Sequence, residues 1–430
     1  MSLESEMKND TMAPASQRSS EGLAESLIRV NALDYELPSN MSVVVARNLK
    51  RSFANLDQYK QNGKVIITLN TGTDYCDGIN SYLTFKAKTV RTSGQANEAR
   101  ATFGSGSACN FLENITVTSR SGVEVERIEG LNSLRREHDR YQCSQDWIDN
   151  FGSVMGYTDE AKNNEVVLDE TDKTFCIPMG RLLGMFNTRK LIPSQLVGGL
   201  RIEIKLASLA SALGPTTVAN SSVPADYQLT DVTIMCDTYQ LADSIQKRLN
   251  MMAASNGLEF YFETYDRTKH NETASQKANI TVRKAVSRAL WAVAKTRLTA
   301  DVEDITKDSM SSEVNNVQNF QFRLGSLYFP NQPLRNKEEQ YYYAQYAFDK
   351  VKQCHKQNSV SLADFKGNEG IVAVTLERSN VLGLSGLPIN SSRTLQLDMN
   401  FDTPASRDID IYMAYLKLVR VFVNNTIVKE

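Results

Sequence analysis

The sequence predicts an all-β fold of two consecutive antiparallel β-sandwiches with short helical insertions. Apolar and polar residues alternate in many short segments, which is typical of half-buried antiparallel strands. The pattern occurs in both halves of the chain, and polar or glycine-containing connections separate the segments. An α/β fold would need helices between successive strands, so two sandwiches are the better prediction.

Residues 1–45 are predicted to form an N-terminal arm. Its first part is polar and irregular, and Ser20 could cap a short helix that places Leu23, Leu27 and Val30 on one face. Two interpretations follow from this pattern. Either the arm docks on its own domain, or it faces the interior of an assembly and contacts a neighbouring subunit or a lipid layer.

Residues 46–250 are expected to form the first sandwich, and residues 251–430 the second. The division is placed near residues 244–257, because the alternating pattern breaks there. Each half is long enough to bury its own core. Strands are expected at residues 65–69, 112–118, 200–206, 232–236, 258–262, 320–324, 372–376, 395–401 and 418–423.

Two helical insertions interrupt the strands. The first lies within residues 124–151 and carries the charged run from Arg135 to Arg140, so it is expected to be exposed to solvent. His138 is accordingly interpreted as a solvated surface histidine. The second lies near residues 336–355. Its apolar face is formed by Tyr341, Ala344, Phe348 and Val351.

The connection at residues 78–106 is predicted to be a long loop. It contains few apolar residues and many of Ser, Thr, Asn and Gly. Long connections on a rigid sandwich usually run over the surface, so we expect this one to be exposed.

No constellation of residues predicts catalysis, a cofactor or a metal. His138, His270 and His355 lack metal-ligand spacing with one another and with the cysteines. Neither a phosphate-binding P-loop nor a G-x-S-x-G nucleophile elbow occurs. Asp408 and Asp410 are better interpreted as a turn than as metal ligands. We therefore expect no catalytic, cofactor-binding or metal site and no enzymatic activity.

The six cysteines are widely spaced and form no C-x-x-C motif, so we expect buried, reduced thiols. Residues 1–8 carry charges without an apolar core and are not expected to be a signal peptide. No run of about 18 apolar residues predicts a membrane-spanning helix.

The charge of the chain argues against a role in coating nucleic acid. Its 48 basic and 50 acidic residues give a net charge of −2, whereas such proteins are usually strongly basic. Residues 1–64 hold eight basic and eight acidic residues, without the cationic run that phosphate neutralisation requires. Residues 269–297 combine seven cations with Trp291, which is also typical of nucleic-acid grooves. Apolar residues at packing positions favour an ordinary strand pair, and no sequence-specific nucleic-acid binding is expected.

Several segments resemble, in the same order, parts of double-jelly-roll major capsid proteins. They are Lys190-Leu191-Ile192-Pro193 with residues 196–204, then residues 227–232, then residues 323–334, and finally Ser385-Gly386 before the strand at residues 395–401. The best comparison is with the capsid proteins of Polinton-like viruses, virophages and nucleocytoplasmic large DNA viruses. It covers roughly residues 60–430.

The resemblance implies two consecutive jelly rolls and a structural function. Proteins of this family form pseudo-hexagonal homotrimers that assemble with neighbouring capsomers into an icosahedral viral shell, together with penton and minor capsid proteins. Their termini face the interior, often above a membrane, which would bring the arm near an internal membrane. The implied location is the virion, assembled inside the host cell.

An alternative is a receptor- or carbohydrate-binding protein with two sandwiches. Aromatic residues clustered on loops would favour it. The cluster Tyr341, Tyr342 and Tyr343 falls instead on an expected helix, which weakens this alternative.

Overall fold

The computed structural model describes residues 44–157, 166–216, 218–348, 351, 358–377 and 386–422, and the backbone of residues 427–429. Residues 1–43 of the predicted arm lie outside the described residues, and so do Cys354 and His355. Among the helices described, none is both long enough and apolar enough to cross a membrane.

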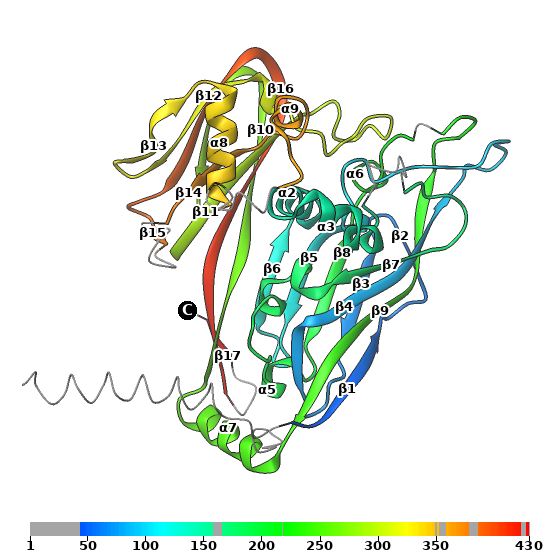
Figure 1. Ribbon diagram of the computed structural model, residues 1–430, viewed down its shortest axis with the longest axis vertical. Helices are drawn as coiled ribbons and strands as arrows, with labels where there is room; N and C mark the ends of the chain where they lie inside the picture. The colour runs from blue at the N-terminus through cyan, green and yellow to red at the C-terminus, as the bar shows by residue number, and fades with distance from the viewer. Residues whose placement is uncertain are drawn as a thin grey trace, which may run out of the picture. The chain divides into compact units, whose positions relative to one another are not determined.

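The first sandwich consists of two antiparallel sheets (Figure 1). The strand order is β1–β9–β4–β7 in one sheet, where β2 also pairs with β9, and β3–β8–β5–β6 in the other. The alternating pattern sets the inner face, where Ile202 and Ile204 of β8 pair with Val117 and Ile115 of β5. The strands are β1 (Val44–Phe53), β2 (Gln58–Lys60), β3 (Lys64–Thr68), β4 (Tyr75–Val90), β5 (Leu112–Thr118), β6 (Glu124–Glu129), β7 (Lys173–Pro178), β8 (Arg201–Leu206) and β9 (Asp226–Leu241).

The second sandwich repeats this strand order with fewer and longer strands. The first half of β16 pairs with β12 and with the end of β10, whereas its second half pairs with β11 and with the start of β10. β13 pairs with β12 and extends that sheet, whereas β14 and β15 pair with β11 and extend the other sheet. The strands are β10 (Leu258–Val282), β11 (Val286–Leu298), β12 (Val317–Leu324), β13 (Leu327–Leu334), β14 (Val372–Thr375), β15 (Leu387–Ile389), β16 (Leu395–Val421) and β17 (Ile427–Lys429).

Both sandwiches have jelly-roll connectivity. In the first, β1 and β2 count as one strand. In the second sandwich, β10 and β16 each count as two strands, one for each half, whereas β14 and β15 together count as one strand. Numbered along the chain, strands 1-8-3-6 then form one sheet and strands 2-7-4-5 the other, in both sandwiches. Eight strands in this arrangement make a jelly roll.

β10 and β16 form a long paired ribbon that passes from one sheet of the second sandwich to the other (Figure 1). The register shifts between Glu272 and Ser275 and again between Ser275 and Lys277, and Ala274 adopts a left-handed φ of 45°. Extra residues at such bulges bend a strand and increase its twist. At these bulges β10 and β16 bend and pass from one sheet of the sandwich into the other, without a break in either strand.

Short helices occupy connections between the strands. Within residues 124–151, the first six residues form β6 instead of a helix, and α2 and α3 follow. α7 lies between β9 and β10, so the predicted domain division at residues 250 and 251 falls inside a helix and stays a prediction. The helices are α2 (Leu131–Gln142), α3 (Gln145–Asp149), α4 (Met179–Leu182), α5 (Ser194–Val197), α6 (Leu209–Ala212), α7 (Asp243–Ser255), α8 (Lys337–Ala347) and α9 (Leu362–Lys366).

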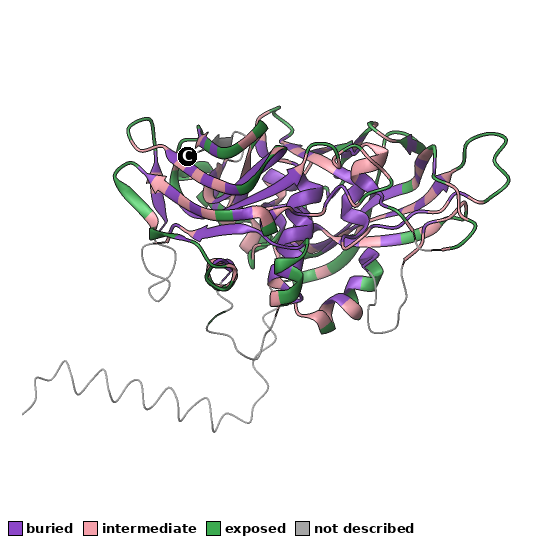
Figure 2. Ribbon diagram, turned by 90° about the horizontal axis from the view of Figure 1, so that it is seen from above, coloured by how far each residue is buried: buried purple, intermediate pink, exposed green. Residues whose placement is uncertain are grey.

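The prediction of one long, exposed loop at residues 78–106 is wrong for its first part, which is a strand, and for Ala99 and residues 101–103, which are buried. β4 continues to Val90, and its inward side chains Leu83, Phe85 and Ala87 are buried. The other face of β4 carries small and polar residues. Only one face of the strand is therefore apolar, which explains why the segment contains few apolar residues. Figure 2 shows the same division in the rest of the chain, with buried residues along the strands and exposed residues mainly in the connections.

Candidate functional site

The charged helix α2 is buried, so the prediction that it is exposed is wrong. Every residue from Leu131 to Tyr141 is buried, including the charged run from Arg135 to Arg140. α2 follows β6 of the first sandwich, but Arg136 and Glu137 form ion pairs with residues of the second sandwich. Asp139 instead pairs with Arg181 of the first sandwich. Burial of charges is costly unless partners neutralise them, and those partners here are distant in the sequence.

Arg136 is the centre of the ion pairs between α2 and the second sandwich. Its Nη2 lies 3.0 Å from Oε1 of Glu369 and 3.1 Å from Oδ2 of Asp308, and it also donates to Ser105. The side chain of Arg136 is fully buried and that of Glu369 is 6% exposed. Burial lowers the pKa of Arg136, but the carboxylates of Asp308 and Glu369 outweigh burial and raise this pKa above its usual value.

A second buried ion pair joins α2 to β11. Nζ of Lys295 pairs with Glu137, and both side chains are buried. Burial lowers the pKa of Lys295 to about 8, although the charge of Glu137 acts in the opposite direction. The positive charges of Arg136 and Arg297 lower this pKa further. Lys295 is thus held in a dry site among charges of both signs.

Hydrogen bonds to backbone carbonyl groups hold both ends of α2. The hydroxyl of Tyr412 donates to the carbonyl oxygen of Gly130 at 3.0 Å, just before the helix begins. Near its end, Ser359 Oγ donates to the carbonyl oxygen of Arg140 at 2.8 Å. We refer to α2 with its ion pairs to Lys295, Asp308 and Glu369 as the charged joint between the sandwiches.

His138 is buried in the charged joint, and its interpretation as a surface histidine is wrong. Its ring stacks on Trp291 with centroids 6.0 Å apart and planes 26° apart. Its Nε2 lies 3.3 Å from the hydroxyl of Tyr265. Trp291 is itself buried and contacts Phe348, with ring centroids 5.3 Å apart. This tryptophan therefore packs in the interior and offers no surface on which a base could stack.

The basic segment at residues 269–297 is largely neutralised within the chain. Lys269 lies 3.2 Å from Asp408, and Lys284 lies 3.2 Å from Asp266. Lys295 and Arg297 are buried in ion pairs of their own. Four of its seven cations are thus ion-paired, which leaves little net charge for binding phosphates.

The prediction that Asp408 and Asp410 mark a turn is also wrong. Both lie inside β16 and are buried. Asp410 accepts hydrogen bonds from Nε of Arg267 in β10 at 2.8 Å and from Nη2 of Arg297 in β11 at 2.6 Å. The sequence carried a signal for this, because both aspartates alternate with isoleucines, and a carboxylate within an apolar strand requires a buried partner.

The five cysteines in the described ranges form no disulfide, and four of them are buried as predicted. Cys76, Cys109, Cys143 and Cys236 are buried, and Cys176 is half-buried. Burial raises the pKa of the Cys109 thiol to about 12, which keeps it protonated. Over the described ranges, no group of three or more His, Cys, Asp and Glu side chains is placed to hold a metal ion.

Strand β1 carries an exposed apolar surface at the edge of its sheet, which we call the β1 edge. It comprises Val45, Leu49 and Phe53 of β1 and Leu56, which follows the strand; they are 61%, 55%, 67% and 57% exposed. β1 pairs with β9 and stands last in the strand order of its sheet. Exposed strand edges with large apolar side chains favour association with another chain.

The tyrosine cluster lies on α8, as the sequence predicts. The hydroxyl of Tyr341 donates to the carbonyl oxygen of Val360 at 2.9 Å, and its ring packs on Phe365. Tyr342 is exposed. At least one of the three tyrosines therefore serves the internal packing of the second sandwich.

Comparisons with known proteins identify the fold. No protein-family model and no curated protein sequence matches the chain. The Faustovirus major capsid protein matches with a TM-score of 0.60 and 8% identity, covering 94% of this chain and 96% of that one. This is the double-jelly-roll fold. The mavirus major capsid protein is also similar, with a TM-score of 0.55, 9% identity and coverage of 92% of each chain.

A further double-jelly-roll structure is that of VP54 from PBCV-1, which was fitted into a reconstruction of the virophage Sputnik. It matches with a TM-score of 0.63 and 13% identity, covering 92% of this chain and 98% of that one. The resemblance that the sequence motifs indicate is thus confirmed at the level of the fold.

Proposed function

We propose that the chain is the major capsid protein of a virus, located in the virion, and that it has a structural function without enzymatic activity. The observation that supports this most is the pair of jelly rolls with identical strand order in one chain. The same architecture occurs in the similar viral capsid proteins over more than nine-tenths of this chain. The charged joint would hold the two jelly rolls as one building block.

We further propose that three copies assemble into a pseudo-hexagonal trimer, and that trimers form an icosahedral shell inside the host cell. The β1 edge supports association, because contact with a neighbouring copy would remove its apolar side chains from water. Penton and minor capsid proteins are the expected further partners. The arm, predicted at residues 1–45 and here taken up to the start of β1 at Val44, would face the shell interior, near any internal membrane.

Mass photometry and negative-stain imaging of the purified full chain test the proposal. Trimers with a hexagonal outline, or larger shells, are expected at rising protein concentration. A monomer that persists at high concentration would contradict self-assembly. A glycan array on the same preparation tests the carbohydrate-binding alternative, for which saturable binding by the monomer is the expected sign.

A double variant, Leu49→Lys with Phe53→Lys, tests the β1 edge. We expect it to shift the population from trimer to monomer while the thermal midpoint of the monomer stays unchanged, because both side chains are exposed. Val223→Lys is the matched control, since Val223 is an exposed apolar residue outside β1. Equal trimer populations in all three proteins would exclude the β1 edge as the contact.

A further inference from the structure

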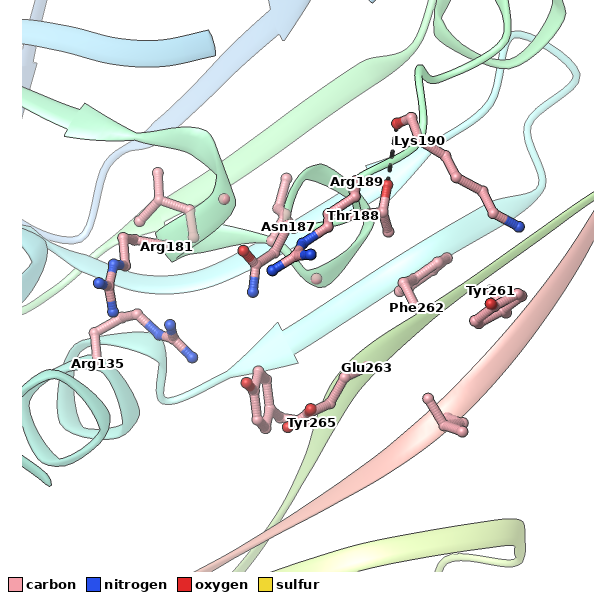
Figure 3. Close-up of a pocket in the computed structure, with 15 residues that line it drawn as sticks. Arg135, Arg181, Asn187, Thr188, Arg189, Lys190, Tyr261, Phe262, Glu263 and Tyr265 are labelled. Carbon is pink, nitrogen blue, oxygen red and sulfur yellow. Dashed lines mark hydrogen bonds between the residues drawn. The ribbon is translucent and has the colours of Figure 1, made fainter. Parts of the chain in front are cut away.

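A cationic pocket lies beside the charged joint (Figure 3). Its volume is about 300 Å³, which is ample for a small anion. Arg135 comes from α2, Arg181 from α4, and Arg189 from the connection that follows (Figure 3). The opposite wall is the start of β10, including Glu263. The first and second sandwiches therefore both line this pocket.

Arg135 is a buried cation that, within the described part of the chain, leaves two of its three side-chain nitrogens without a hydrogen-bond partner. Its side chain lies in the wall of the pocket, and the whole residue is 3% exposed. Neither Nε nor Nη2 has a hydrogen-bond partner among the described residues. Its guanidinium carbon lies 5.2 Å from the ring centroid of Tyr265, which offsets only part of the cost of burial. An anion in the pocket would supply the missing acceptors.

Besides Arg135, the pocket is lined by further cationic side chains and by a single carboxylate. Arg181 donates to Asp139 at 3.2 Å and lies 4.7 Å over the ring of Trp147, so its position is set by the first sandwich. Arg189 is exposed at the pocket rim. Glu263 is the one carboxylate among the lining residues, and burial raises its pKa. The lining thus carries more positive than negative charge.

We propose that this pocket binds a phosphate group, free or as part of a small phosphate ester. A phosphate dianion offers acceptor oxygens in a tetrahedral arrangement to guanidinium groups that approach from different sides, whereas the two oxygens of a carboxylate monoanion lie in one plane and share a single charge. Bound there, it would link α2 and α4 of the first sandwich to β10 of the second. The phosphate would then stabilise the contact between the sandwiches without taking part in any reaction.

Isothermal titration calorimetry of the full chain with inorganic phosphate tests the proposal, with chloride at equal ionic strength as the blank. We expect saturable binding and a rise of the thermal midpoint with phosphate concentration. Acetate should bind about tenfold more weakly or not at all. A second titration uses glycerol 3-phosphate. If this ester binds more tightly than inorganic phosphate, the natural ligand of the pocket is a small phosphate ester. Failure of both phosphate compounds to bind would overturn the proposal.

Variants identify the residues that bind. Arg135→Gln is expected to weaken phosphate binding by roughly tenfold or more. Arg201→Gln, an exposed arginine on β8 outside the pocket, is the control that should leave the affinity unchanged. Glu263→Gln removes the opposing carboxylate and should strengthen binding. If Arg135→Gln does not fold, Arg189→Gln provides the test, because its side chain is exposed. Unchanged affinity in the arginine variants of the pocket would refute the site.

Discussion

Arg136 and Glu369 lie 3.0 Å apart although 233 residues separate them in the sequence. The first belongs to the helix between β6 and β7 of one jelly roll, and the second precedes β14 of the other. Both side chains are buried. This charged pair is therefore one of the contacts that join the two jelly rolls, and their stability should be sensitive to the loss of either partner.

Removing one partner of this pair should destabilise the protein strongly. Arg136→Met leaves Glu369 and Asp308 without their common partner, and a loss of about 3 to 5 kcal/mol is expected. The thermal midpoint in differential scanning calorimetry gives the measurement, with Arg201→Gln on the surface as the control. Arg136→Met combined with Glu369→Gln should recover part of the loss. A double variant whose loss of stability equals the sum of the losses in the two single variants would show that the two side chains are not coupled.

The protonation of Lys295 should make stability depend on pH in the alkaline range. Its folded pKa of about 8 lies below the ordinary value of 10.5, so the unfolded chain binds more protons between these two values. Stability from this group therefore rises with pH from about 8 to 10.5, by at most about 1.4 kcal/mol per pH unit.

Comparison with Lys295→Met isolates this effect from other titrating groups. The thermal midpoint of the wild type should rise relative to that of the variant as pH increases from 8 to 10. A difference between the two midpoints that does not change with pH would show that Lys295 has an ordinary pKa, and a fall of the wild-type midpoint relative to that of the variant would show a raised one.

Gly130 should tolerate alanine less well than another glycine with the same backbone requirement. Both Gly130 and Gly94 have positive φ, of 63° and 87°. A Cβ at Gly94 would meet nothing within 4 Å, whereas a Cβ at Gly130 would lie 2.6 Å from the hydroxyl oxygen of Tyr412 and 2.8 Å from Cδ of Arg267. Gly94→Ala should cost about 1 to 2 kcal/mol from backbone strain alone.

Gly130→Ala should cost a further 1 to 3 kcal/mol or so, because it also crowds the charged joint. Thermal unfolding of the two variants in parallel measures the difference. Equal midpoints would mean that Tyr412 and Arg267 move away without cost.

The cysteines should differ in their reactivity with alkylating reagents. Cys109 is buried and burial raises its pKa to about 12, whereas Cys176 is half-buried in β7. Brief treatment of the native protein with iodoacetamide, followed by peptide mass spectrometry, should modify Cys176 first and leave Cys109 unmodified. Denatured protein provides the control, in which both should react. Early modification of Cys109 in the native state would contradict the burial of this thiol.

The sequence by itself determined the fold class and many of the strands. At residues 395–401 every second residue is apolar, and only a strand with one buried face explains that period. The double jelly roll was indicated by the resemblance of several ordered segments to the double-jelly-roll capsid proteins. β4 escaped prediction because its outer face uses small and polar residues, which are equally typical of loops.

Only the tertiary structure decided which charged residues are buried and with which partners they form ion pairs. The run from Arg135 to Arg140 has the local pattern of a solvated helix, and its burial depends on Glu369 and Lys295, which lie far along the chain. Periodicity reports which face of an element is apolar, but it carries no information on which distant charges will meet. For that reason the charged joint and the cationic pocket beside Arg135 emerged only once both jelly rolls were in place.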